Sequence, residues 1–138
     1  MEGDRRVKPA PFEYAAPRSL EEALGLLGEE AKPLAGGQSL VPLLNFRLAR
    51  PELLVDINGL SELARIRRGD DGVLRIGALT RQSELERSEL VAAEWPLLTQ
   101  AVRLVGHPQI RNRGTVGGSV AHADPAAELP VALAALGA

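Results

Sequence analysis

The sequence from Arg111 to Pro130, RNRGTVGGSVAHADPAAELP, carries the strongest functional signal in the chain. It begins with basic residues, has three glycines around Thr115 and Val116, and ends in a segment typical of a helix start. Glycine lets the backbone adopt positive φ, so successive N–H groups can converge on a phosphate, and the N-terminus of a following helix adds a favourable dipole. This order predicts an anion-binding segment in which the backbone makes the contacts.

A shorter segment of similar composition, PLAGGQSL, lies upstream at residues 33–40. Gly36 and Gly37 follow an apolar pair, and Ser39 precedes the apolar residues of a short expected helix. No lysine follows the glycines, so the segment is not a P-loop. Either glycine segment alone is explained as well by an ordinary turn, but together they could hold two phosphates.

Composition excludes several classes of protein. The 138 residues, 45% of them apolar, suffice for one domain or two small subdomains with a hydrophobic core. A net charge of −2 and few aromatic residues argue against nucleic-acid binding. Without cysteine the chain cannot ligate an iron–sulfur cluster, so any such cluster must lie on a partner. No secretion signal or membrane span is expected, and we predict a soluble, cytoplasmic protein.

Residues 1–57 are predicted to form a β-α-β-α-β unit with strands at 11–15, 31–35 and 53–57. The first helix starts at Ser19, which forms a capping box with Glu22, and its apolar face comprises Leu20, Ala23, Leu24 and Leu27. The second helix runs from residue 39 or 40 towards 48, and the dipeptide Asn58-Gly59 is expected to form a turn that closes the third strand. The Gly36-Gly37 turn therefore follows a short, buried second strand.

Residues 58–138 are predicted to form a second subdomain. A β-hairpin turns at residues 69–72: Ala64 and Ile66 are expected to face inward between charged residues, and Val73, Leu74 and Ile76 form the returning strand. Helices follow from residue 80 or 83 to 90 and from 95 to 104, and Asp124 is the expected N-cap of the last helix. Residues 129–138 carry no charge, so we expect that helix to need further sequence or a partner, including a second copy, to cover it.

No arrangement of a nucleophile with a base is evident, and we expect no catalytic residue and no metal ligand in this chain. His122 with Asp124 is too small a set for a metal site. Asp124 and Glu128 could cap a helix or accept a hydrogen bond from a ribose or ribityl hydroxyl. Arg111 and Arg113 could pair with phosphate or with surface carboxylates.

The segments at 33–40 and 111–130 together resemble the FAD-binding medium subunit of the molybdenum hydroxylases, including the carbon monoxide dehydrogenase medium chain and the flavin domain of xanthine dehydrogenase. The resemblance runs from about residue 5 to the end. It implies an α+β fold of the vanillyl-alcohol-oxidase or PCMH type, with two α/β subdomains at residues 1–57 and 58–138 and FAD between them. Family members are much longer, so the resemblance also implies truncation before a C-terminal domain.

By position, the resemblance implies that Leu34–Leu40 and Thr115–Ser119 are the two pyrophosphate-binding loops. The implied FAD contacts are Leu34, Ala35, Gly36, Gly37, Gln38, Ser39, Leu40, Thr115, Val116, Gly117, Gly118, Ser119, Asp124 and Glu128. In the family, electrons pass from a molybdopterin-binding large subunit, through [2Fe–2S] clusters on a small subunit, to this FAD and then to an acceptor.

The predicted function is therefore an FAD-binding electron-transfer subunit, or a fragment of one, of a molybdopterin-dependent dehydrogenase such as aerobic carbon monoxide dehydrogenase. One alternative is a non-enzymatic remnant with an empty flavin site that acts as an assembly or interaction module. A generic nucleotide-binding module is a further alternative, for which a preference for ATP over FAD would be the evidence.

Overall fold

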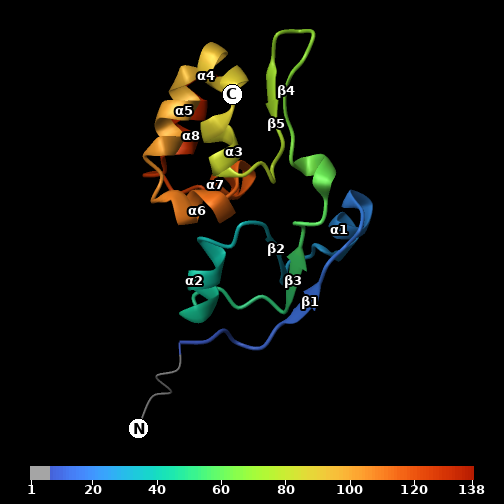
Figure 1. Ribbon diagram of the computed structural model, residues 1–138. Coiled ribbons are helices and arrows are strands. Elements are labelled where there is room, and N and C mark those ends of the chain that lie inside the picture. The colour runs from blue at the N-terminus through green and yellow to red at the C-terminus, as the bar shows by residue number, and fades with distance from the viewer. Residues whose placement is uncertain (1–6) are drawn as a thin grey trace. The chain divides into compact units, whose positions relative to one another are not determined.

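The computed structural model describes residues 7–138, which divide into two compact units, one ending at Leu60 and the other beginning at Ser61 (Figure 1). Residues 1–6 of the expected N-terminal subdomain lie outside the described part. None of the described helices is long and apolar enough to cross a membrane.

The first unit contains a three-stranded parallel sheet. Its strands are β1 (Glu13–Ala15), β2 (Ala31–Leu34) and β3 (Leu53–Asp56), in the spatial order β1-β3-β2. Helices α1 (Leu20–Leu26) and α2 (Leu40–Asn45) connect them (Figure 1). The five elements follow one another as the sequence predicted, and Leu54 and Val55 of the central strand are buried.

Burial in this unit differs from the prediction. The strand β2 was expected to be buried, but Lys32 and Pro33 are exposed because β2 is an edge strand. The side chains of Leu20 and Leu24 on α1 are 43% and 63% exposed, so only Ala23 of the expected apolar face is buried. A period of 3.6 residues identifies an apolar face but does not supply a surface to cover it.

The start of α1 follows the predicted cap with one difference. The Ser19 hydroxyl accepts a hydrogen bond from the Glu22 N–H at 3.1 Å, as in a capping box. The Glu22 carboxylate, however, accepts from the N–H of Arg18 at 2.8 Å, one residue before the cap. The second helix, α2, ends at Asn45, earlier than the expected 48.

The second unit begins with a short 3-10 helix, η1 (Ser61–Leu63), and an antiparallel hairpin of β4 (Ile66–Arg68) and β5 (Leu74–Ile76). Ile66 packs against the helical core, as predicted, and Leu74 and Ile76 of the returning strand pack there too, whereas Val73 is exposed. Ala64, also predicted to face inward, is exposed because it precedes the paired strand.

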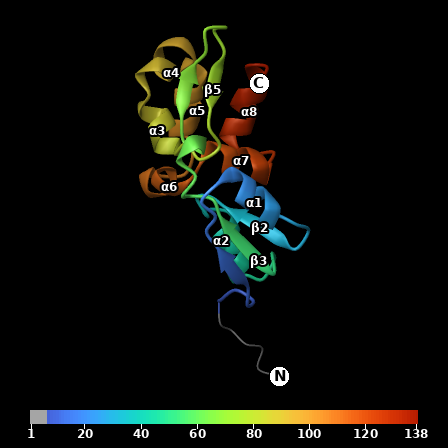
Figure 2. The ribbon, with the colours of Figure 1, turned by 90° about the vertical axis from the view of Figure 1, so that its right-hand side faces the viewer.

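Six helices complete the second unit (Figure 2). They are α3 (Gln82–Arg87), α4 (Glu89–Glu94), α5 (Pro96–Arg103), α6 (Pro108–Arg113), α7 (Val116–His122) and α8 (Glu128–Ala135). Their shared core includes the fully buried Leu85, Val91, Val102 and Leu129. The helix predicted up to residue 90 is two helices, because Ser88 ends α3 and caps α4 by accepting from the Val91 N–H at 3.3 Å.

The final helix begins later than predicted. Asp124 is not its N-cap: the Asp124 carboxylate accepts from the Ala126 N–H at 2.9 Å and forms a turn, and α8 starts at Glu128. Leu129 and Ala132 are buried within the unit, whereas Val131 and Leu136 are exposed. The unit itself therefore covers part of the uncharged segment.

Candidate cofactor-binding segments

The upstream glycine segment leaves the carboxyl end of β2 and leads into α2. Gly36 is buried, and Gly37 has a φ of +73°, a conformation that glycine adopts without strain. Within residues 7–138, the backbone N–H groups of Gly36, Gly37, Gln38 and Ser39 donate to no acceptor. Of these four residues Gly36 is the buried one, and a buried N–H group is almost always paired. A free N–H at Gly36, followed by three more just before α2, has the character of an anion site.

A side chain at Gly37 would be strained by the positive φ and would crowd two neighbouring side chains. A Cβ atom at Gly37 would lie 3.1 Å from Cγ2 of Val41 and 3.4 Å from Cδ1 of Leu34. The Gly37 carbonyl also accepts from the Val41 N–H at 2.9 Å, which ties the turn to the first turn of α2. Positive φ and close packing therefore both require glycine here.

Asn58, which the sequence marks only as part of an Asn-Gly turn, supports the same segment. Its side-chain amide donates to the carbonyl oxygen of Ala35 at 2.9 Å. The dipeptide predicts the turn correctly, but a contact across 23 residues leaves no local signal in the sequence.

The downstream glycine segment is a helix start and not an open loop. Thr115 is the N-cap of α7, and its hydroxyl accepts from the Gly118 N–H at 3.0 Å. The expected positive φ is wrong for Gly117 and Gly118, which both lie inside α7. A β-bridge joins Arg81 to Thr115, so the segment is fixed against the chain that precedes α3.

The glycines of α7 serve close packing. The Val116 N–H donates to the Thr80 carbonyl and the Gly117 N–H to the Ala78 carbonyl, both at 2.9 Å. A Cβ at Gly117 would lie 2.6 Å from Cα of Ala78, closer than van der Waals contact allows. The N–H groups of Val116 and Gly117 therefore already have partners, so at these two residues the predicted convergence of backbone donors on a phosphate is absent.

The two basic residues before this segment differ in environment. Arg111 is buried, and its guanidinium donates from Nε to the Glu86 carboxylate at 2.9 Å and from Nη1 to the Val105 carbonyl at 3.0 Å. Arg113 is exposed, and its carbonyl accepts from the Arg81 guanidinium at 2.7 Å. Of the two roles considered for Arg111, the structure supports pairing with a carboxylate.

The acidic and histidine candidates lie near the surface. Asp124 and His122 are exposed, and Glu128 is half-buried in the first turn of α8. His107 is the N-cap residue of α6, and its Nδ1 lies 2.8 Å from the Gln109 side-chain oxygen. Among the described residues, no group of three or more histidine and carboxylate side chains is placed to hold a metal.

Gln82, which no sequence pattern marks, also supports the downstream segment. Its backbone N–H donates to the Gly114 carbonyl at 2.9 Å. Its side-chain oxygen is buried and has no partner in the described part of the chain, and a Cβ at Gly114 would lie 2.7 Å from it. Gly114 is thus required for the close approach of Gln82.

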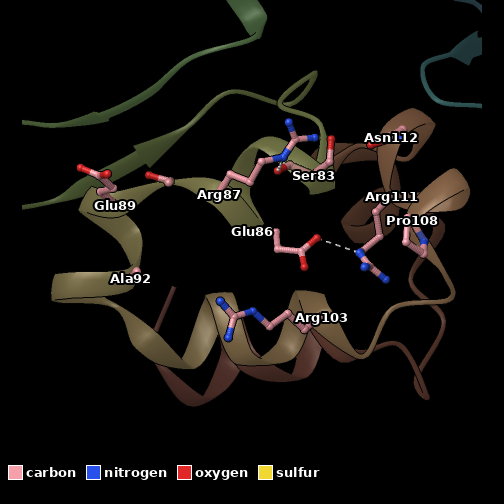
Figure 3. A pocket seen from close by; sticks show the side chains of 10 residues that line it. Ser83, Glu86, Arg87, Glu89, Ala92, Arg103, Pro108, Arg111 and Asn112 are labelled. Atoms are coloured by element: carbon pink, nitrogen blue, oxygen red, sulfur yellow. Dashed lines mark hydrogen bonds and ion pairs between the residues drawn. The ribbon is translucent and has the colours of Figure 1, made fainter.

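A polar groove of about 640 Å³ lies among α3, α4, α5 and α6. Figure 3 shows Arg87 on α3 across the groove from Arg103 on α5, with the Glu86–Arg111 ion pair near them. None of the sequence-predicted FAD contacts lines it.

Comparison with known proteins gives consistent matches. Residues 10–138 match the family model described as FAD binding domain in molybdopterin dehydrogenase. The 6-hydroxypseudooxynicotine dehydrogenase complex subunit alpha of Paenarthrobacter nicotinovorans is 56% identical over 96% of this chain and 45% of its own length. The carbon monoxide dehydrogenase medium chain of Hydrogenophaga pseudoflava is 49% identical over 88% of this chain and 43% of its own length.

The fold agrees with solved structures of the same group. The crystal structure of quinoline 2-oxidoreductase from Pseudomonas putida 86 superimposes with a TM-score of 0.85 at 44% identity, covering 89% of this chain and 44% of that chain. The predicted α+β, PCMH-type fold is confirmed. The chain spans less than half the length of the curated relatives it matches. Its sequence and fold place it in the family of FAD-binding domains of molybdopterin dehydrogenases, the medium subunits of molybdenum hydroxylases, whose cofactor is FAD.

Proposed function

We propose that this chain holds the FAD of an electron-transferring subunit in a molybdopterin-dependent dehydrogenase. The observation that carries the proposal is the run of unpaired backbone N–H groups from Gly36 to Ser39, at the carboxyl end of a parallel strand. Ligands of parallel sheets bind beyond the carboxyl ends of the strands, and a pyrophosphate needs several hydrogen-bond donors at short range. The segment fits the pyrophosphate of FAD on both counts.

The downstream segment would contribute differently. The Val116 and Gly117 N–H groups are paired with carbonyls, and the Gly118 N–H is paired with the Thr115 hydroxyl. We therefore propose that the contribution of this segment comes from the Ser119 hydroxyl, for which the described part of the chain offers no partner. The full proposed contact set remains Leu34–Leu40, Thr115–Ser119, Asp124 and Glu128. Bound FAD would supply the redox chemistry, and the protein would supply binding, orientation and exclusion of solvent.

The electron donors would lie on partner subunits. This chain has no cysteine, so a [2Fe–2S] cluster must be ligated elsewhere. We propose a small subunit that carries such clusters and a large subunit that carries molybdopterin. The matched relatives are named for different substrates, 6-hydroxypseudooxynicotine, carbon monoxide and quinoline, while they share this domain. Carbon monoxide dehydrogenase is therefore one candidate among several activities that the large subunit would determine.

A cytoplasmic location belongs to the same proposal, since a chain without cysteine gains no disulfide from an oxidising compartment.

The test is flavin retention. The purified chain, alone and with its partner subunits, is incubated with FAD and desalted, and flavin absorbance is measured. We expect wild-type protein to retain FAD and Gly37→Val to lose it, because the valine would meet Val41 and Leu34 at a positive φ. Gly72→Val is a matched control, because Gly72 has a φ of +76° but only one distant neighbour, at 3.9 Å.

The outcomes separate the proposal from its alternatives. Flavin retention by Gly37→Val equal to that of Gly72→Val would refute the assignment of the segment. A wild-type protein that stays colourless even with its partners would favour the assembly module, and a preference for ATP would favour a generic nucleotide site.

A further inference from the structure

A chain of hydrogen bonds runs from β1 to the upstream glycine segment within the first unit. The Tyr14 hydroxyl donates to Oδ2 of Asp56 at 2.5 Å. Oδ1 of Asp56 accepts from the Asn58 backbone N–H at 3.0 Å and from its side-chain Nδ2 at 2.7 Å. The same Nδ2 donates to the carbonyls of Ala35 at 2.9 Å and Leu34 at 3.3 Å.

The bonds of Asn58 meet the chain where it leaves the sheet. Leu34 is the last residue of β2, and the Ala35 carbonyl is the last before Gly36. Beyond this point the described structure gives the segment little other support: one long bond of 3.3 Å from the Gln38 side chain to the Gly36 carbonyl, and the bonds that α2 makes back to it. The direction of the backbone at Gly36 is therefore set largely by the Asn58 amide.

Asp56 in turn fixes the Asn58 side chain. A carboxylate that accepts both the backbone and the side-chain N–H of one asparagine holds that side chain in one rotamer. One of the two Nδ2 hydrogens points to Asp56, and the other is left for the carbonyls at the exit of β2. Tyr14 restrains the other carboxylate oxygen, so the network links β1, β3 and the exit of β2. An amide held in this way can orient the Ala35 carbonyl without rearrangement when a ligand binds, whereas the Leu34 carbonyl is also held by the Ile57 N–H at 3.1 Å.

We propose that Asn58 is a positioning residue for the FAD pyrophosphate segment: it orients the Ala35 carbonyl so that the following N–H groups are preorganised for the anion. This inference rests on the proposed function for its ligand. Preorganisation raises affinity because the ordering of the loop is completed before binding. The effect of Asn58 is therefore expected in FAD affinity and in the mobility of residues 36–40.

The experiment compares Asn58→Ala and Asn58→Asp with wild-type protein, using the full chain together with any subunits that accompany it. Asn58 is exposed, so neither change is expected to unfold the protein. Asn58→Ala removes the donors and should weaken FAD binding about fivefold, the value of one typical hydrogen bond. Asn58→Asp places a carboxylate against two carbonyls and beside Asp56, so the affinity of this variant for FAD should fall further. Gln100→Ala and Gln100→Glu, at an exposed position on α5 of the second unit, are the controls, because Gln100 lies outside every proposed contact.

A second readout is independent of flavin. Amide hydrogen exchange of residues 36–40 should accelerate in both Asn58 variants, while the exchange of β4 and β5 and the melting temperature stay close to the wild-type values. A purely structural role would instead lower the melting temperature and accelerate exchange throughout the first unit.

Each outcome decides one question. Unchanged FAD affinity and unchanged exchange at residues 36–40 in both Asn58 variants would overturn the positioning role. Wild-type protein that binds no FAD, with faster exchange at residues 36–40 in the variants, would refute the proposed function and leave the role of Asn58 in ordering the segment supported.

Discussion

Removal of the Glu86 carboxylate should destabilise the second unit markedly, because the Arg111 guanidinium, which is mostly buried, then lacks its counter-charge. The side chains of Arg111 and Glu86 are only 11% and 24% exposed, and Nε and the carboxylate lie 2.9 Å apart. Breaking a fully buried pair costs about 3–5 kcal/mol, whereas an exposed pair contributes about 0–1 kcal/mol. The partial exposure of Glu86 places the expected cost of Glu86→Ala at about 2 kcal/mol.

The matched control lies in the same unit. Glu94 pairs with Arg68 at 3.3 Å, but the two side chains are 36% and 52% exposed, so Glu94→Ala should cost about 0.5 kcal/mol or less. Urea unfolding measures the difference. With an m-value of about 2 kcal/mol per molar, Glu86→Ala should lower the midpoint by about 1 M, and Glu94→Ala by about 0.2 M.

A double variant tests the cause. Replacement of Arg111 by methionine in the Glu86→Ala background removes the uncompensated charge, and the midpoint should recover by at least half of the loss. Equal midpoints for Glu86→Ala and Glu94→Ala, or no recovery in the double variant, would refute the view that Arg111 is held by a buried ion pair.

Two further predictions concern Tyr14 and Gly117. Tyr14 is the only tyrosine of the chain, and its hydrogen bond to Asp56 raises the pKa of its phenol above the ordinary 10.0. An ultraviolet titration should therefore give a midpoint above 10.0, and Asp56→Asn should lower that midpoint. Because the folded-state pKa is the higher one, the stabilisation from this bond is complete below pH 10.0 and is lost as pH rises through the folded-state pKa; a midpoint at or below 10.0 would contradict this assignment. Gly117→Ala would place its Cβ 2.6 Å from Ala78 and should lower the stability of the fold by about 1–3 kcal/mol through overpacking. Gly25→Ala is the control, because a Cβ at Gly25 has no neighbour within 4 Å and should not destabilise the protein. Thermal melting measures both variants, and equal melting temperatures would disprove the close approach of Gly117 to Ala78.

The sequence predicts the first unit well in element order, because its signals there are local. Alternating and helical apolar patterns, the Ser19 cap and the Asn58-Gly59 turn each act within a few residues. The exposure of Leu20 and Leu24 was not predictable in the same way, because burial depends on which surfaces are available to cover a face.

The errors in the second unit have a common physical origin. Glycine disfavours helices by about 1 kcal/mol per residue, so a stretch with Gly117 and Gly118 favours a loop on local grounds. Tertiary pairing overrides that preference, since the carbonyls of Ala78 and Thr80 accept the first N–H groups of α7. The partner of Arg111 is likewise 25 residues away in Glu86, a contact that one sequence cannot reveal.

The family was predictable because two glycine segments together are more specific than either alone. The family model confirms that recognition over residues 10–138, although the downstream segment is helical and not the loop expected from its composition. The contact residues themselves stay a prediction until flavin binding is measured in the variants described above.

The strand order β1-β3-β2 also constrains how the protein is made. The central strand β3 is the last of the three to leave the ribosome, and β1 and β2 do not pair with each other. The glycine segment and its carbonyls therefore emerge before the strand that supports them and before Asn58. The described part of the first unit has no sheet until residues 53–56 are added, so we expect the glycine segment to become ordered in one late step and not progressively during synthesis.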